Sequence, residues 1–454
     1  MTRNKQPSVK SIKLSFEPAE RVTSFGGLAV AQRLLLRLGL PRVMENALPP
    51  RAGYSLAQIT ASALAGFLSG AAGTFVTEAV RQDPALLALA GLGRAPEEAT
   101  FWRATRCAGA PEALAAYAGA AATLARRAIE RSPRIALAER GGFVPVFVDG
   151  TLLEGSPRRE ATKDLTKSGK GRGLMWTAAF VGPYPAAQRL CAAGEGEQTA
   201  ARDLIRRVDE QVLAKTGLKK DALVLMDSLH GNGPTLGLLE ERGLDYIAGS
   251  RGLARAEQAL EQQPGRQWTP TPEYEKERPG IEESAVCVAS VQCDGWPRPR
   301  TLVGRRWRRK GQLFWEYSSV ITSLGADDER LRAQSPGAFA QAVWRLYNRK
   351  GACENHFKNL LADLRLHRPP CREHRRNAGF YAIAFLAGLA CVAIDVLTSK
   401  PSRRRLRIAT LRRWLFAVPA RIARGGRQAR VTILGLSGRW RSWIEDRFRR
   451  AARC

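Results

Sequence analysis

Two short apolar runs, each followed directly by an aspartate, constrain the fold of this chain more than any other feature. Residues 143–148 read Phe-Val-Pro-Val-Phe-Val and precede Asp149, and residues 222–226 read Ala-Leu-Val-Leu-Met and precede Asp227. A continuous apolar run of this length is typical of a strand that is buried within a sheet. If the two strands are neighbours in one sheet, their carboxylates meet at the same edge.

The segments around these runs alternate between strand-like and helix-like patterns. Strand patterns cover residues 174–181 and 188–193, a charged helix is predicted over 199–215, and a helix over 234–242 precedes a strand at 246–248. Strands that alternate with helices over short connections indicate an α/β fold. We therefore predict an α/β core that carries both aspartates.

The flanking regions differ from this core. Apolar residues at helical spacing predict an all-helical N-terminal region, whereas strand patterns at 285–291, 301–306 and 314–321 predict a β-rich insertion, after which helical spacing returns over 336–366. The predicted organisation is a helical N-terminal domain (1–140), the first part of the core (141–250), the β-rich insertion (251–325), the second part of the core (326–398) and a basic C-terminal region (399–454).

The charge of the chain points to nucleic acid as its partner. The formal net charge is +30 over 454 residues, and the last 55 residues hold 17 Lys and Arg against only Glu445 and Asp446. Such a basic surface attracts polyanions and releases their counterions on binding. The basic tail also contains aromatic side chains suited to base stacking. These are Trp414, Phe416, Trp440, Trp443 and Phe448.

Cysteine usage and hydropathy indicate the cellular compartment of the protein. The eight cysteines are scattered and the N-terminus shows no basic-then-apolar signal segment, so a reducing cytoplasm is expected. Residues 378–397 are long and apolar enough to resemble a membrane span, but they include Asp395 and many small residues. We predict a buried helix there and no membrane association.

Three carboxylates from distant parts of the chain can form a metal site. Cutting and joining phosphodiesters suits a pair of divalent ions held by hard oxygen ligands, and Asp149, Asp227 and a helix-borne Glu354 can supply them. Mg²⁺ is the expected ion, and Mn²⁺ can substitute. Each residue also has an ordinary interpretation, since an aspartate after a strand is often a turn residue and a helical glutamate is usually exposed.

Two histidine features leave the interpretation open. His230 follows Asp227 closely and can face the metal cleft, contact DNA or simply occupy a turn. Cys353, His356, His367 and Cys371 loosely suggest zinc spacing, but the first pair flanks Glu354 within one helix, so no zinc site is assigned.

The order strand-Asp, strand-Asp, β-rich insertion, helix-Glu resembles the DDE transposases of bacterial insertion sequences that carry a group-one DDE domain. Residues 146–151 (Val-Phe-Val-Asp-Gly-Thr) and 224–228 (Val-Leu-Met-Asp-Ser) are similar to the motifs of the first and second aspartates. Residues 347–358 (Tyr-Asn-Arg-Lys-Gly-Ala-Cys-Glu-Asn-His-Phe-Lys) are similar to the motif of the glutamate, with departures: the usual Arg three residues after the Tyr is Lys350, and the usual distal Lys is Leu361.

The resemblance implies an RNase H-like catalytic core and the catalytic and metal-binding residues Asp149, Asp227 and Glu354. It implies DNA contacts by Tyr347, Arg349, Lys350 and Lys358, and recognition of terminal inverted repeats by the N-terminal helices. The expected partners are the repeats, target DNA and a second copy of the chain in a homodimeric DNA complex, and the expected location is the nucleoid of a bacterial cytoplasm.

Two alternatives to transposition remain from the sequence. One is a domesticated or decayed transposase that binds DNA without cutting it. The other is a repair or recombination nuclease on the same fold, which would act without terminal repeats.

Overall fold

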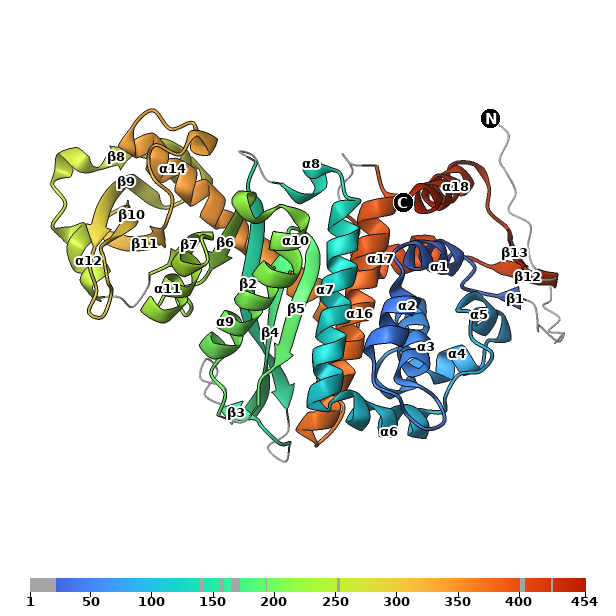
Figure 1. Ribbon diagram of the computed structural model, residues 1–454. Helices are drawn as coiled ribbons and strands as arrows, with labels where there is room; N and C mark the ends of the chain where they lie inside the picture. The colour runs from blue at the N-terminus through green and yellow to red at the C-terminus, as the bar shows by residue number, and fades with distance from the viewer. Residues whose placement is uncertain are drawn as a thin grey trace, which may run out of the picture.

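A mixed sheet of ten strands runs through one half of the molecule, and two long neighbouring helices separate it from a helical half (Figure 1). The structure is a computed structural model and describes residues 22–138, 142–155, 159–164, 172–192, 194–250, 254–400, 405–425 and 428–454. The predicted boundaries after residues 140 and 250 adjoin residues outside this described part.

Five strands form the centre of the sheet in the order β5-β4-β2-β6-β7. β2 pairs parallel with β6, β6 pairs parallel with β7, and β4 pairs antiparallel with both β2 and β5. This arrangement is that of an RNase H-like core, so the predicted fold class is confirmed. The bounds are β2 (Val144–Gly155), β4 (Arg172–Val181), β5 (Tyr184–Leu190), β6 (Ala222–Met226) and β7 (Asp245–Gly249), with the short β3 (Lys163–Asp164) beside β4.

The two apolar runs are adjacent parallel strands, as the sequence suggested. Val146 lies beside Val224 and Phe147 beside Leu225, and all four side chains are buried. One difference is that β2 continues to Gly155, because its second half pairs with β4. Asp149 therefore lies within β2, two residues beyond the last residue of its parallel register with β6.

Helices of the core cover this sheet. α9 (Glu197–Val208) continues through a π-helical turn (Asp209–Leu213) into α10 (Ala214–Thr216), and α11 (Gly233–Glu241) connects β6 to β7. The start of α11 is capped by the Asn232 side chain, which accepts a hydrogen bond from the amide of Thr235.

The β-rich insertion extends the core sheet. β11 pairs antiparallel with β7 through Val320, Ile321 and Thr322, so the insertion strands continue the same hydrogen-bonded array. Its elements are α12 (Ala254–Glu261), β8 (Thr269–Pro270), α13 (Pro272–Glu277), β9 (Ile281–Val291), β10 (Arg300–Arg309) and β11 (Glu316–Thr322).

The segment predicted as one helix over 336–366 is interrupted. α14 (Pro336–Tyr347) and α15 (Gly351–Asp363) are joined by a 3-10 turn at Asn348–Lys350. The turn is tighter than an α-helix, so Tyr347 and Glu354 do not share one continuous α-helical ladder.

Over the described residues 22–138, the N-terminal region is helical apart from a two-residue strand, β1 (Val22–Thr23), which pairs with β12 near the C-terminus. Its helices are α1 (Leu28–Arg37), α2 (Leu40–Ala47), α3 (Leu56–Ser69), α4 (Glu78–Arg81), α5 (Pro84–Leu89), α6 (Glu98–Ala108), α7 (Pro111–Glu130) and α8 (Arg134–Leu137).

The long helix α16 (His374–Thr398) lies beside α7 and connects the two halves of the molecule (Figure 1). By length and composition it could cross a membrane, but 94% of its most apolar window is buried within the structure. The prediction of a buried helix is therefore confirmed.

The C-terminal elements pack on the helical half. They are α17 (Ile408–Leu411), a π-helical turn (Arg412–Phe416), β12 (Ala420–Gly425), β13 (Gln428–Ile433) and α18 (Gly438–Arg453). Arg447 of α18 reaches Asp395 of α16 at 3.0 Å, and both side chains are buried. The acidic residue within the apolar segment thus anchors the last helix.

Candidate active site

Asp149 and Asp227 lie level with each other on neighbouring strands. The parallel register ends at Phe147 beside Leu225, and extending it by two residues brings Asp149 opposite Asp227. Their charges are close enough that Asp227 contributes to raising the pKa of Asp149. Both side chains are half-buried at the same edge of the sheet.

Asp227 organises the loop that follows β6. Its Oδ1 accepts from the amide of Leu229 at 3.0 Å and from that of His230 at 3.4 Å. This is the local turn that an aspartate forms with the backbone two and three residues on. Asp227 therefore acts as a turn residue and still stands beside Asp149.

Lys350 forms an ion pair with Asp149. Its Nζ lies 3.0 Å from Asp149 Oδ2, and the side chains are only 20% and 14% exposed. Burial, the largest cause, and the charge of Asp227 together raise the pKa of Asp149 despite the nearby ammonium. Burial alone would lower the pKa of Lys350, but the Asp149 carboxylate raises it, so Lys350 stays charged.

Glu354 lies in the first turn of α15 with an exposed side chain. Its neighbour Cys353 is buried, and burial together with the charges of Asp149, Glu354 and Asp227 raises the pKa of that thiol. Cys353 is thus within electrostatic range of all three predicted carboxylates. The Glu354 carboxylate does not join the close group of ligand atoms described below.

The residues expected to contact DNA take three different positions. Tyr347 is half-buried, and a Cβ built on Gly249 would lie 2.7 Å from its hydroxyl, so the glycine allows this close approach. Arg349 and Lys358 are exposed. Lys358 also lines a cavity of about 560 Å³ together with Arg405 and Arg407.

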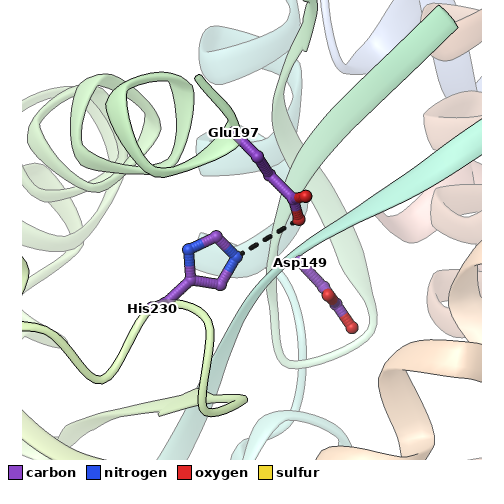
Figure 2. A group of neighbouring side chains, drawn as sticks. All are labelled: Asp149, Glu197 and His230. Atoms are coloured by element: carbon purple, nitrogen blue, oxygen red, sulfur yellow. Dashed lines mark ion pairs between the residues drawn. The ribbon is translucent and has the colours of Figure 1, made fainter. Parts of the chain in front are cut away.

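Two further side chains, Glu197 and His230, lie beside Asp149 (Figure 2). Among the described residues, potential ligand atoms of Asp149, Glu197 and His230 all lie within 4.8 Å of one another. Asp227 and Glu354 are outside this group. The close cluster therefore differs from the predicted triad of Asp149, Asp227 and Glu354, although it includes the first aspartate.

Glu197 was not identified from the sequence. It is the first residue of α9, where an acidic residue is ordinarily explained by the helix dipole. The available signal was Gly150 directly after Asp149, because a Cβ at that position would lie 2.2 Å from Glu197 Oε1. A sequence alone does not show which side chain occupies the space above a glycine.

His356 faces the core and not a metal. Its ring lies 5.0 Å from that of Phe180 and 5.5 Å from that of Phe147. Burial lowers the pKa of His356 to about 4, so the ring is neutral at pH 7.

Comparisons with known proteins found a family model and a solved structure that are similar to this chain. A family model described as the transposase DDE domain, group 1, matches residues 179–442, a range that contains Asp227 and Glu354 and begins after Asp149. Among solved structures, the chain is similar to a piggyBac transposase in a synaptic complex with hairpin DNA. That likeness has 14% identity and a TM-score of 0.42, and covers 86% of this chain and 79% of the other.

No curated protein matches the chain. The family match nevertheless spans more than half of the 454 residues. The chain therefore belongs to the transposase DDE domain group 1 family.

Proposed function

We propose that this transposase cuts and joins DNA strands at the terminal inverted repeats of a bacterial insertion sequence, with Asp149, Asp227 and Glu354 as its metal-binding catalytic residues. The observation that carries the proposal is the level placement of Asp149 and Asp227 on the adjacent parallel strands β2 and β6. Carboxylates at the end of a parallel strand pair are suitably placed to bind a shared substrate group.

The side chains at this edge fit a divalent metal. Asp149 and Asp227 offer hard oxygen ligands of the kind that Mg²⁺ prefers, and Mn²⁺ can replace it. Glu354 is exposed on the first turn of α15 and lies outside the close cluster, and we propose that it adds its carboxylate when the metal and DNA are bound. Divalent ions in such a site stabilise charge on the attacking and leaving oxygens of a phosphodiester.

The proposed reaction has two steps. A water oxygen attacks the phosphorus at the end of the element, and the bond to the 3′ oxygen breaks to leave a free 3′-hydroxyl. That hydroxyl then attacks a target phosphodiester and releases a target 3′-hydroxyl. In both steps the Lys350 ammonium beside Asp149 is available to contact a phosphate oxygen, since it remains protonated.

Two basic surfaces support DNA binding. Lys358 shares its cavity with Arg405 and Arg407, next to the helix that carries Glu354. On the C-terminal elements, Arg413 and Arg439 line a second cavity together with Trp414, Trp440 and Trp443. Cations beside exposed aromatic rings suit phosphate contact and base stacking.

The proposal includes an oligomeric state and a cellular location. Because an element has two ends, we expect a homodimer with one copy at each terminal repeat, and the helices of residues 1–140 as the repeat-binding part. A DNA-bound protein of this kind would reside at the nucleoid in a bacterial cytoplasm.

The test is a cleavage and strand-transfer assay on a duplex that carries the inverted repeats flanking the gene. Wild type is compared with Asp149→Asn, Asp227→Asn and Glu354→Gln in Mg²⁺, and DNA binding is measured in parallel. We expect end cleavage and joining by the wild type, loss of both by at least about 100-fold in each variant, and retained DNA binding.

Other results would favour the alternatives. Tight binding without cleavage by the wild type would identify a non-catalytic DNA-binding protein. Cleavage that ignores the terminal repeats would identify a nuclease. Cleavage that survives Glu354→Gln would remove Glu354 from the catalytic set.

A further inference from the structure

His230 is a buried histidine for which the proposed mechanism has no use. Its side chain is fully buried in the loop after β6, and neither ring nitrogen makes a hydrogen bond to any residue in the described part of the chain. A buried polar group left in this way costs roughly 1–3 kcal/mol, so a histidine with two such atoms calls for a binding partner.

Two carboxylates lie near this ring. His230 Nε2 lies 3.4 Å from Glu197 Oε1, and a ligand atom of Asp149 completes a group within 4.8 Å (Figure 2). Glu197 and Asp149 are each 14% exposed, so the group lies at the edge of the solvent and can be reached by an ion. Three separate elements supply it: β2, the start of α9 and the loop after β6.

The backbone leaves room for this arrangement. Gly150 lies directly beneath the Glu197 carboxylate, and a Cβ there would approach Glu197 Oε1 to 2.2 Å and Met175 Sδ to 3.0 Å. A side chain at position 150 would displace the Glu197 carboxylate from its present position. The glycine next to the first aspartate thus admits a second carboxylate to the site.

We propose that Asp149, Glu197 and His230 form a divalent-metal position with two carboxylate oxygens and one imidazole nitrogen. Such a donor set favours a first-row transition metal such as Mn²⁺ over Mg²⁺, because imidazole is a softer ligand than the all-oxygen set that Mg²⁺ prefers. The inference rests on the proposed function, which it deepens: it adds Glu197 and His230 to the metal-binding residues and names the preferred class of ion.

The experiment measures metal binding by the full-length chain without DNA. Mn²⁺ and Mg²⁺ are titrated calorimetrically into wild type, Glu197→Gln, Gly150→Ala and His230→Gln, with Asp203→Asn as the control that removes an exposed carboxylate from the same helix α9. Pulsed EPR of the bound Mn²⁺ then reports nitrogen coupling from an imidazole ligand. Circular dichroism checks the fold of each variant.

We expect the wild type to bind Mn²⁺ at least about tenfold more tightly than Mg²⁺, with nitrogen coupling. Glu197→Gln and His230→Gln should each weaken Mn²⁺ by about tenfold or more, and His230→Gln should abolish the nitrogen coupling. Gly150→Ala should weaken Mn²⁺ in a folded protein, because the atom it displaces is the end of a flexible side chain. Asp203→Asn should bind as the wild type does.

Bound Mn²⁺ without nitrogen coupling in the wild type, or unchanged affinity in folded Glu197→Gln, would overturn the proposal. A result in which Mn²⁺ binds with nitrogen coupling while the DNA assay shows no cleavage would sustain this metal position and reject the proposed function. The two failures are therefore distinguishable.

Discussion

At the scale of single residues, the site combines charges of both signs within a small space. Lys350 neutralises Asp149, while Asp227 and Glu197 stand on other sides of the same aspartate. Burial and the charge of Asp227 raise the pKa of Asp149, whereas the Lys350 ammonium lowers it.

Lys358 provides a residue-scale test of DNA contact. Lys358→Ala should weaken duplex binding uniformly across sequences and reduce the slope of log K against log salt by roughly one, because one phosphate contact is lost. Fluorescence anisotropy at several salt concentrations measures this slope. Lys215→Ala, which removes an exposed lysine outside the cavity, is the control. Equal slopes for wild type and Lys358→Ala would exclude the contact.

At the scale of elements, the insertion is fastened to the core by an ion pair. Arg300 at the start of β10 lies 2.7 Å from Glu240 of α11, with side chains 2% and 14% exposed, and Tyr246 of β7 donates to the same carboxylate at 2.8 Å. Burial by itself raises the pKa of Glu240, but these hydrogen bonds bring it below its ordinary value.

Glu240→Gln should lower the free energy of unfolding by roughly 1–3 kcal/mol at pH 7, since Arg300 loses its charged partner. The folded-state pKa of Glu240 is lowered, so its stabilisation is full above the ordinary value of 4.5 and is lost as the pH falls through the folded value. The difference between wild type and variant in urea denaturation should therefore shrink below pH 4.5.

The control for this pair is Arg298→Ala. Arg298 lies 3.6 Å from the same carboxylate but is 67% exposed, so its loss should change stability by less than about 1 kcal/mol. A Glu240→Gln effect as small as that of Arg298→Ala, or one that does not depend on pH, would show that the pair does not hold the insertion.

The C-terminal elements present two tryptophans to solvent, whereas Phe416, expected from the sequence to be available for base stacking, is buried. Trp414 of the π-helical turn is 48% exposed and Trp440 of α18 is 42% exposed. Trp414→Ala should weaken binding of a single-stranded oligonucleotide by roughly tenfold, since one stacked base contributes about 1–3 kcal/mol. Tryptophan-quenching titrations, or anisotropy for the variant, measure the change. Phe75→Ala, which removes a 62% exposed ring elsewhere, should have no such effect.

At the scale of the whole molecule, the first described strand and the C-terminal elements lie in the same half. β1 pairs with β12, and the buried ion pair of Arg447 with Asp395 holds α18 against α16. The N-terminal helices, the central helix α16 and the basic tail are therefore one packed unit, and the tail is not a loose appendage (Figure 1).

The variant Arg447→Met tests whether the Arg447–Asp395 ion pair holds this unit together. It leaves the Asp395 carboxylate buried without its cation and should reduce the free energy of unfolding by roughly 3–5 kcal/mol. Adding Asp395→Asn to that variant should recover part of the loss. Arg450→Ala, which breaks an exposed pair with Asp446, is the control and should cost less than about 1 kcal/mol. Similar unfolding curves for Arg447→Met and Arg450→Ala would contradict the anchoring role.

The sequence by itself was sufficient for the local features of this protein. The runs before Asp149 and Asp227 identified two buried strands, the alternating pattern identified the α/β core, and the apolar segment with Asp395 was correctly interpreted as a buried helix. These features are readable because periodicity and burial preference are properties of contiguous residues. The motif order also indicated the family to which the chain belongs.

Only the tertiary structure decided which side chains meet. The pairing of Lys350 with Asp149, the exposure of Glu354 and the cluster of Asp149 with Glu197 and His230 join segments that are far apart in the chain. The 3-10 turn between α14 and α15 likewise follows from packing and not from helical spacing. Such contacts depend on the register of strands and the space above a glycine, which a linear pattern does not encode.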